Sequence, residues 1–215
     1  YMVFGVTFFL ALTFHQSLPV PFFSIFLGLL AGLMHFSRAD GILWLLIAAV
    51  GVLKEPRHTS SSCTSHRDWQ LVSRFAFVLL GYFLIMGPWM IRNMLVFGTP
   101  LAPGGSRALW LTYYDELYAF PAEKLTFSHW WASGLGAILK ARLWALGQNL
   151  QTALAVQGSI VLLPLIVWGG WYRRHDFRVQ IGALAWVLTL AAMTLAFPFA
   201  GVRGGFFHSG AALQP

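Results

Sequence analysis

Apolar residues in this chain are gathered into long stretches separated by polar or proline-containing segments. The stretches cover residues 1–14, 22–36, 41–53, 75–89, 153–171 and 179–199. Long apolar runs predict helices that cross a membrane, because a helix satisfies its own backbone polar groups away from water. We therefore expect an all-α fold, a polytopic helical membrane protein that forms a single region over residues 1–215 with about six transmembrane stretches.

The second and third stretches are separated only by Ser37 to Asp40. The third stretch is short, and its residues cover only about 20 Å of a hydrocarbon core that is about 30 Å thick. We expect either that this turn lies below the membrane surface or that the third helix continues into the next loop. Non-helical backbone at such depth must be buried in protein or line a wet cavity, so the turn is a first indication of a site.

A further helix is predicted between the fourth and fifth stretches. Its leucines recur at three- and four-residue spacing, at Leu135, Leu139, Leu143, Leu146 and Leu150. The polar residues fall largely on the rest of the helix, at Lys140, Arg142, Gln148, Asn149 and Gln151. This pattern, preceded by two tryptophans, predicts an amphipathic helix lying in the membrane interface. The helix is either purely structural or faces a substrate.

The composition strengthens the membrane interpretation. Hydrophobic residues make up 58% of the 215 residues and charged residues only 10%, against about 25% in soluble domains. A soluble globular protein is therefore excluded. The formal charge of +7 does not indicate nucleic acid, because no basic cluster is joined to exposed stacking aromatics. A single cysteine, Cys63, excludes a disulfide framework and a cysteine-based zinc site.

The positive charges predict the orientation. The loops at 54–74 and 172–178 together hold seven Lys or Arg in 28 residues, whereas 92–152 holds five in 61. Because cytoplasmic loops are enriched in basic residues, we expect 54–74 to be a cytoplasmic basic loop and 92–152 an extracytoplasmic segment that contains the amphipathic helix. The Arg38 turn and the 198–215 tail then share the extracytoplasmic side.

Arg38 is the first candidate for binding. An arginine close to hydrocarbon needs a partner, and Asp40 is two residues away. One interpretation is a local ion pair or helix cap. The other is that the planar guanidinium of Arg38 binds a lipid-linked phosphate, which it matches with two parallel hydrogen bonds.

Two further arginines are candidates. Arg92 and Asn93 follow Pro88, which should kink or end the fourth stretch, and Arg92 could alternatively extend to lipid headgroups. Arg203 lies among glycines that permit a tight backbone beside an anion, with His208 and Ser209 following. For His208 a structural hydrogen bond is the simpler role.

Other chemistry has no support in the sequence. His208 and Ser209 are adjacent in sequence, which does not make a nucleophile pair. No spacing suits a metal site, and neither a Walker loop nor a dinucleotide fingerprint occurs. We expect no cofactor.

Three motifs, taken in order, resemble those of the polytopic glycosyltransferases of the GT-C class, especially the bacterial branch akin to dolichyl-phosphate-mannose protein mannosyltransferases and the aminoarabinose transferase. Residues 28–41 (GLLAGLMHFSRADG) are similar to that family's GLLxGLaxLtRpdG hairpin, with Ala39 where the family often has Pro or Tyr. Residues 88–100 (PWMIRNMLVFGTP) are similar to PWxxRNxxxFGxP. Residues 203–209 (RGGFFHS) resemble a tail motif of some members.

The resemblance implies an enzyme that moves a sugar from a polyprenyl-phosphate carrier to an unidentified acceptor, in a bacterial plasma membrane with its active face extracytoplasmic. It also implies a catalytic carboxylate in a loop between the first two spans. This sequence would begin after that loop, so we expect a fragment that is inactive alone. The donor phosphate would be bound by Arg38, Arg92 and Arg203, with Asp40, Asn93, His208 and Ser209 in support.

Two other classes stay open. A multi-pass transporter or a non-enzymatic membrane scaffold would also contain intramembrane charge and a broken hairpin, although such transporters usually have inverted repeats. A lipid-linked-oligosaccharide ligase or polymerase would share the carrier phosphate and differ in the acceptor.

Overall fold

The computed structural model describes residues 1–14, 18–54, 64–101, 105, 107–118 and 121–213. The described residues form helices and turns without a strand, which confirms the all-α prediction. The longer helices are α1 (Met2–Thr13), α2 (Val20–Ser37), α3 (Leu43–Lys54), α4 (Thr64–Phe97), α7 (Leu135–Thr152), α8 (Leu163–Tyr172) and α9 (Phe177–Ala191).

Short helical turns connect these helices. The turn η2 (Ala39–Ile42) joins α2 to α3. Residues 105–134, which we call the outer segment, contain η3 (Ala108–Trp110), η4 (Tyr114–Tyr118), η5 (Ala122–Lys124) and α6 (Phe127–Ala132). Wide helical turns of the π type follow α7 and α9, namely η6 (Ala153–Gln157) and η7 (Ala192–Ala196). After η7 the chain continues through α10 (Pro198–Ala200), η8 (Gly201–Gly205), α11 (Phe206–Gly210) and η9 (Ala211–Leu213).

Glycines bring α2 and α4 into close backbone contact. A Cβ atom on Gly28 of α2 would lie 2.1 Å from the Val78 carbonyl oxygen of α4, and one on Gly81 of α4 would lie 2.2 Å from the Ile25 carbonyl oxygen of α2. Gly32 follows Gly28 at the i+4 position on the same side of α2. Small residues at this spacing are typical of helices that associate in membranes, where packing rather than water exclusion joins them.

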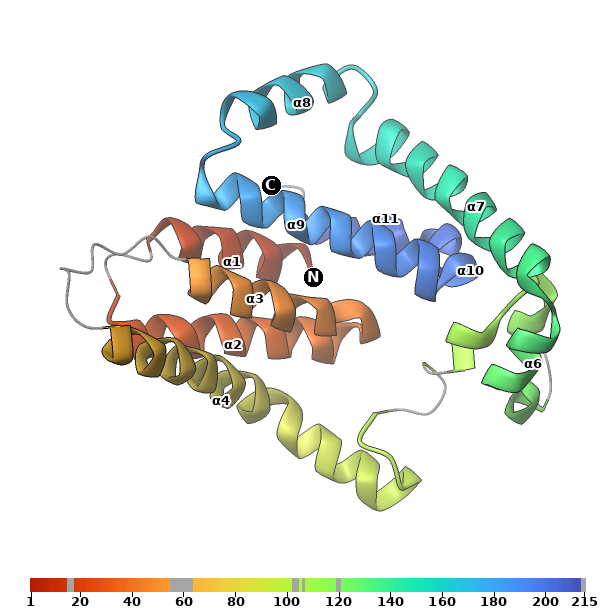
Figure 1. The fold of residues 1–215 in the computed structure, drawn as a ribbon, viewed down its shortest axis with the longest axis horizontal. Coiled ribbons are helices and arrows are strands. Elements are labelled where there is room, and N and C mark those ends of the chain that lie inside the picture. Colours follow the sequence, from red (N-terminus) through yellow and green to blue (C-terminus); the bar gives the residue numbers. More distant parts are fainter. Residues whose placement is uncertain (15–17, 55–63, 102–104, 106, 119–120, 214–215) are drawn as a thin grey trace.

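The main core lies among α1, α2, α3, α4 and α9. The rings of Phe8 in α1 and Trp44 in α3 meet edge to face, with centroids 5.1 Å apart. Ile181 and Ala185 of α9 are buried against this cluster. The N-terminal helices and α9 thus form one helical bundle (Figure 1).

Among the described residues, three helical segments are long and apolar enough to cross a membrane: Val20–Ser37, Trp69–Phe97 and Phe177–Ala196. They correspond to the second, fourth and sixth stretches of the sequence. The helices of the first and third stretches, α1 and α3, have 12 residues each. At about 1.5 Å per residue, each is about 18 Å long, so the expected shortness of the third helix is confirmed.

The fifth stretch does not form a single helix. Residues 153–171 were expected as one span, but they are divided into the π turn η6, a tight turn and the ten-residue helix α8. Ser159 and Ile160 in the tight turn have positive φ angles of 46° and 49°. A positive φ angle is unfavourable for a β-branched residue such as Ile160, so the residue types here do not suggest a turn. Hydropathy gave no sign of this break, because the segment is apolar.

The basic segment 54–74 differs from the expected loop. Helix α4 begins at Thr64, so residues 64–74 of the segment are helical, while residues 55–63, with Arg57 and Cys63, lie outside the described residues. Arg74 is buried, and its Nη1 donates to the Val52 carbonyl oxygen at 3.4 Å. Arg74 therefore binds the C-terminal turn of α3, where a positive charge is favourable, rather than facing water.

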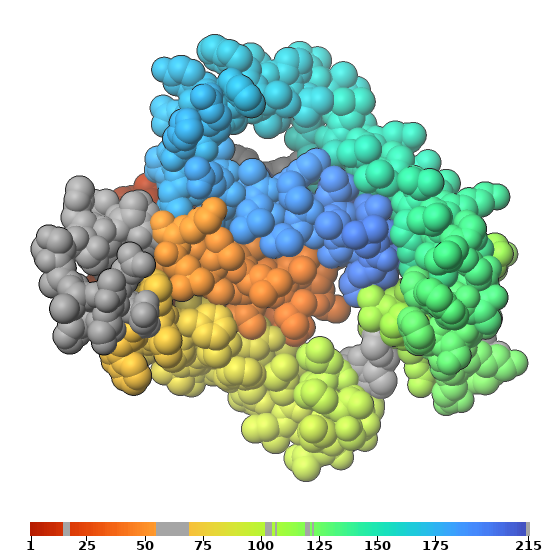
Figure 2. Space-filling view, viewed as in Figure 1, coloured from red at the N-terminus to blue at the C-terminus, as the bar shows by residue number. Residues whose placement is uncertain are grey.

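The ends of the helices separate into two groups (Figure 1). The end of α3, the start of α4 and the start of α9 lie at one end of the bundle. The α2–α3 turn, the end of α4 and α10 lie at the other end, where the outer segment is attached. In Figure 2 the end of α4 projects away from the rest of the surface. The segments that the charge pattern assigns to opposite sides are therefore at opposite ends of the bundle.

Helix α7 confirms the predicted helix over 135–152, but not the predicted position of its polar residues. Arg142 and Asn149 are buried together with Ile138, Ala141 and Ala145. The side chains of Leu135, Leu139, Leu143 and Leu150 are exposed. The leucine spacing identified an apolar side correctly, but spacing alone does not tell which side of a helix meets the protein.

Candidate functional site

The turn that carries Arg38 is formed by local backbone geometry. Helix α2 ends at Ser37, and Arg38 is extended, with φ −153° and ψ 140°. The Gly41 N–H then donates to the Arg38 carbonyl oxygen at 2.9 Å, which starts η2. A Cβ atom on Gly41 would lie 2.2 Å from the Met34 carbonyl oxygen, so a glycine is required where the turn passes the end of α2.

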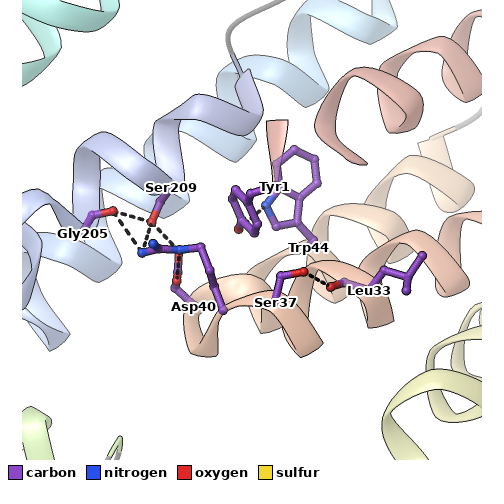
Figure 3. Close-up of polar contacts among 8 residues, drawn as sticks. Tyr1, Leu33, Ser37, Asp40, Trp44, Gly205 and Ser209 are labelled. Atoms are coloured by element: carbon purple, nitrogen blue, oxygen red, sulfur yellow. Dashed lines mark hydrogen bonds and ion pairs between the residues drawn. The ribbon is translucent and has the colours of Figure 1, made fainter. Parts of the chain in front are cut away.

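The guanidinium of Arg38 is held from both sides. Its Nε donates to Asp40 Oδ1 at 2.9 Å, and its Nη2 donates to the Gly205 carbonyl oxygen at 3.3 Å and to Ser209 Oγ at 3.2 Å. Figure 3 shows Gly205 and Ser209 facing Asp40 across these contacts. Among the described residues, Nη1 has no hydrogen-bond partner. The side chain of Arg38 is 27% exposed and that of Asp40 is 8% exposed.

Ser209 completes this cluster. Its hydroxyl lies against the second carboxylate oxygen of Asp40 and 2.6 Å from the Gly205 carbonyl oxygen. Because a hydroxyl has one proton, it donates to one of these oxygens at a time. The ring of Tyr1 lies under the guanidinium of Arg38, 5.6 Å from its Cζ. The sequence pairing of Arg38 with Asp40 is confirmed, and Ser209 joins them from 169 positions beyond Asp40.

Arg203 lies near this cluster in sequence but has different partners. Gly204 has a φ angle of 100°, a conformation that favours glycine, so the glycine-dependent tight backbone expected here is present. The exposed Arg203 guanidinium lies over the ring of Tyr114 at 5.0 Å and donates from Nη1 to the Tyr118 hydroxyl. Arg203 thus links the outer segment to η8.

Arg92 and Asn93 form a third, separate arrangement. Helix α4 continues through Pro88 to Phe97, so this proline does not end the fourth helix. Arg92 Nη1 donates to Asn93 Oδ1 at 3.2 Å, and its Cζ lies 4.9 Å from the centre of the Trp89 ring. The buried Asn93 donates from Nδ2 to the Pro100 carbonyl oxygen at 3.4 Å, which ties the end of α4 to the following chain. None of these contacts involves Arg38.

His208 is exposed on α11, and its ring packs edge to face on Phe207 with centroids 5.0 Å apart. It has no hydrogen bond within the described part of the chain. Its predicted structural hydrogen bond is therefore not seen there. Of the predicted site residues, the structure brings Arg38, Asp40 and Ser209 together and leaves Arg92, Asn93, Arg203 and His208 with other neighbours.

Glu116 organises the outer segment. Its Oε2 accepts hydrogen bonds from the backbone N–H groups of Thr112 and Tyr113, and its Oε1 lies 2.8 Å from His129 Nε2. Burial of this carboxyl acts to raise its pKa, but these hydrogen bonds together outweigh burial and hold the pKa of Glu116 below its ordinary value. The carboxylate therefore stabilises the fold of this segment.

Two buried polar residues were not among the predicted site residues. Arg142 of α7 donates from Nη1 to the Leu111 carbonyl oxygen at 3.1 Å and lies 5.4 Å from the Trp130 ring. His35 Nδ1 lies 2.5 Å from the Tyr82 hydroxyl, which joins α2 to α4. His35 lies inside the motif at 28–41, about one helical turn before Arg38. That position was the only sign in the sequence that His35 could matter.

Comparison with protein-family models, curated proteins and solved structures finds no match to this chain. Within the described ranges, no three His, Cys, Asp or Glu side chains are grouped so that they could hold a metal ion. Arg38 offers a guanidinium that is already oriented and partly exposed, and its Nη1 amino group has no partner among the described residues.

Proposed function

We propose that this protein binds a polyprenyl-phosphate-linked sugar in a membrane and takes part in transferring the sugar to an extracytoplasmic acceptor. The single observation that carries the proposal is the Arg38 guanidinium, which is fixed through Nε and Nη2 while Nη1 is unused. In the proposal, the carrier phosphate binds there.

The unused Nη1 group of Arg38 can bind an anion. Asp40 offsets the charge of Arg38, which lowers the cost of placing an arginine among apolar helices. A phosphate oxygen at Nη1 would form a charge-assisted hydrogen bond without displacing the existing contacts. In sugar transfer the carrier phosphate is the leaving group, so a donor already oriented toward it stabilises the charge that develops.

The surrounding helices favour a lipid-linked ligand over a soluble one. Three helical segments have the length and apolar character of membrane spans, and lipid tails can lie between such helices. The proposal includes the six-span topology, with the Arg38 turn on the extracytoplasmic side. Arg203 and Arg92 would then assist from the same side, Arg203 after leaving its tyrosine partners.

Binding of the carrier alone tests the proposal. The protein in lipid nanodiscs is titrated with polyprenyl phosphate and with the polyprenol of equal length. We expect the phosphate to bind more tightly, and Arg38→Ala to weaken its binding about tenfold or more, the loss expected for a charge-assisted hydrogen bond. Arg174→Ala, at the other end of the bundle, is the matched control. Equal affinity for both lipids, or unchanged binding in Arg38→Ala, contradicts the proposal.

Turnover is the second test. In the full-length protein, replacing Arg38 or Arg203 by Ala is expected to abolish sugar transfer without loss of membrane insertion. Normal turnover in both variants removes the phosphate-binding role. Carrier binding without any sugar transfer instead favours a transporter or a scaffold.

A further inference from the structure

The path of the chain between the two ends of the bundle raises a length problem. Helix α7 starts near η8 and α10, at the end of the bundle that carries the Arg38 turn (Figure 1). Helix α9 starts at the opposite end. Residues 135–176 must therefore pass from one end to the other. Helix α8, with ten residues, is about 15 Å long, only half of a hydrocarbon core about 30 Å thick.

Helix α7 supplies the missing length. Its 18 residues extend about 27 Å, and it runs obliquely along the bundle, away from α9, rather than lying across the end of the bundle (Figure 1). The π turn η6 and a tight turn then connect it to α8, which continues toward the start of α9. Together α7 and α8 are long enough for a complete crossing, whereas α8 alone is not.

The distribution of side chains along this path fits lipid outside and protein inside. Exposed apolar residues continue from α7 through the break into α8, as in Leu143, Leu154 and Val167, which are 66%, 49% and 63% exposed. Two polar side chains on this path bind neighbouring elements of the protein. The buried Asn149 donates from Nδ2 to Thr194 Oγ1 at 3.2 Å, and the half-buried Gln157 accepts at Oε1 from Trp186 Nε1 at 2.8 Å.

The backbone donors of the break have partners. The N–H groups of Gly158 and Ile160 donate to carbonyl oxygens of Ala153 and Leu154 in the preceding turn, at 2.7 Å and 3.1 Å. Ser159 N–H likewise donates to the Val156 carbonyl oxygen at 3.3 Å. Because an unsatisfied backbone polar group is costly away from water, these hydrogen bonds lower the cost of dividing the crossing here.

We propose that residues 135–172 form one broken membrane crossing, with α7 entering from the Arg38 end, α8 completing it, and the exposed apolar side of both helices in contact with lipid. This inference does not depend on sugar transfer. In place of the interfacial helix and separate span expected from the sequence, residues 135–172 would then form a single crossing that is divided at η6.

Site-directed spin labelling in nanodiscs tests this crossing. In a Cys63→Ser background, single cysteines are introduced at Leu135, Leu154 and Tyr172, which are all exposed, with Glu123→Cys in the outer segment as the control exposed to water. Collisions with a water-soluble nickel complex and with oxygen report the depth of each label. We expect the nickel collisions at position 154 to be about threefold or more below those at 135 and 172, and the oxygen collisions to be highest at 154.

Three outcomes overturn the proposal. If nickel collisions are as frequent at positions 135, 154 and 172 as at the Glu123→Cys control, residues 135–172 lie in water. Equal, intermediate collisions at 135 and 154 place α7 flat in the interface. Low collisions with both reagents, together with spin–spin broadening, show that a second copy covers this side. If labelling at 154 prevents reconstitution, Val167→Cys on α8 provides the same comparison.

Discussion

The α2–α4 pair and the outer segment are held together by different interactions. In the pair, glycines place backbone against backbone, with no room for a Cβ atom at Gly28 or Gly81. In the outer segment, bonds from polar side chains and aromatic contacts connect turns to one another, such as those of Glu116 and Arg142. The helices that carry Arg38 are therefore held by close backbone packing, whereas the outer segment depends on individual side chains.

The largest effect is expected from Gly28→Ala. The new Cβ would lie 2.1 Å from the Val78 carbonyl oxygen, so α2 must move away from α4. We expect the free energy of unfolding, measured by denaturation in micelles, to fall by about 3 kcal/mol. Gly87→Ala is the matched control, because no atom lies within 4 Å of its Cβ position. A helical Gly→Ala change there should stabilise the protein by about 0.5–1 kcal/mol. Equal effects of the two substitutions contradict the close-contact account.

A smaller and more local effect is expected from Arg142→Met. It removes hydrogen bonds to the Leu111 and Leu109 carbonyl oxygens but keeps an unbranched apolar stem. We expect a loss of about 2 kcal/mol that is confined to the outer segment. Hydrogen exchange of residues 108–131 should accelerate while exchange in α2 is unchanged. Lys140→Met, at an exposed position on the same helix, should change neither the stability nor the exchange rates. Accelerated exchange in α2 of the Arg142→Met variant would contradict an effect confined to the outer segment.

Ser209→Ala tests the link between the α2–α3 turn and α11. Without the hydroxyl, Arg38 Nη2 and the second oxygen of Asp40 each lose a partner, so the guanidinium is less well fixed. We expect carrier-phosphate affinity to fall about threefold while the unfolding temperature stays within a few degrees. Ser37→Ala is the control, because the Ser37 hydroxyl bonds only to the Leu33 carbonyl oxygen in its own helix. An equal loss in the two variants contradicts a positioning role.

The smallest effect concerns pH. The folded-state pKa of Glu116 lies below the ordinary value of 4.5, so its stabilisation is fully present above that value and is lost as pH falls through the folded pKa. We expect limited proteolysis of the outer segment to be slower in the wild type than in Glu116→Gln at about pH 6, and this difference to disappear near pH 3. A difference that does not depend on pH points to packing rather than to charge.

The sequence predicted most helices because apolar runs bounded by prolines or charges leave few alternatives. It located Val20–Ser37 and Leu135–Thr152 closely. It did not predict the break within 153–171, because the residues on both sides of that break are mainly apolar. Arg74 was assigned to a cytoplasmic loop and Arg142 to the polar side of an interfacial helix, because hydropathy does not register carbonyl oxygens that become available only after packing.

The candidate site was predicted in part for a similar reason. Arg38 and Asp40 are close in sequence, so their ion pair could be expected from spacing. The contact of Arg38 with Ser209 joins positions 171 residues apart, and spacing carries no information over that distance. Arg38, Arg92 and Arg203 were expected to bind one phosphate together. The sequence did not indicate that Tyr114 and Tyr118 would instead contact Arg203.

In the proposed function the Arg38 guanidinium contacts the carrier phosphate, and solid-state NMR can measure that contact. The protein is prepared with ¹⁵N-labelled arginine side chains, saturated with polyprenyl phosphate in nanodiscs, and examined for ¹⁵N–³¹P dipolar dephasing. We expect clear dephasing in the wild type and in Arg174→Lys, and strongly reduced dephasing in Arg38→Lys, where only Arg92 and Arg203 could still contribute. Dephasing that is undiminished in Arg38→Lys, or that is absent from the saturated wild type, would contradict the contact.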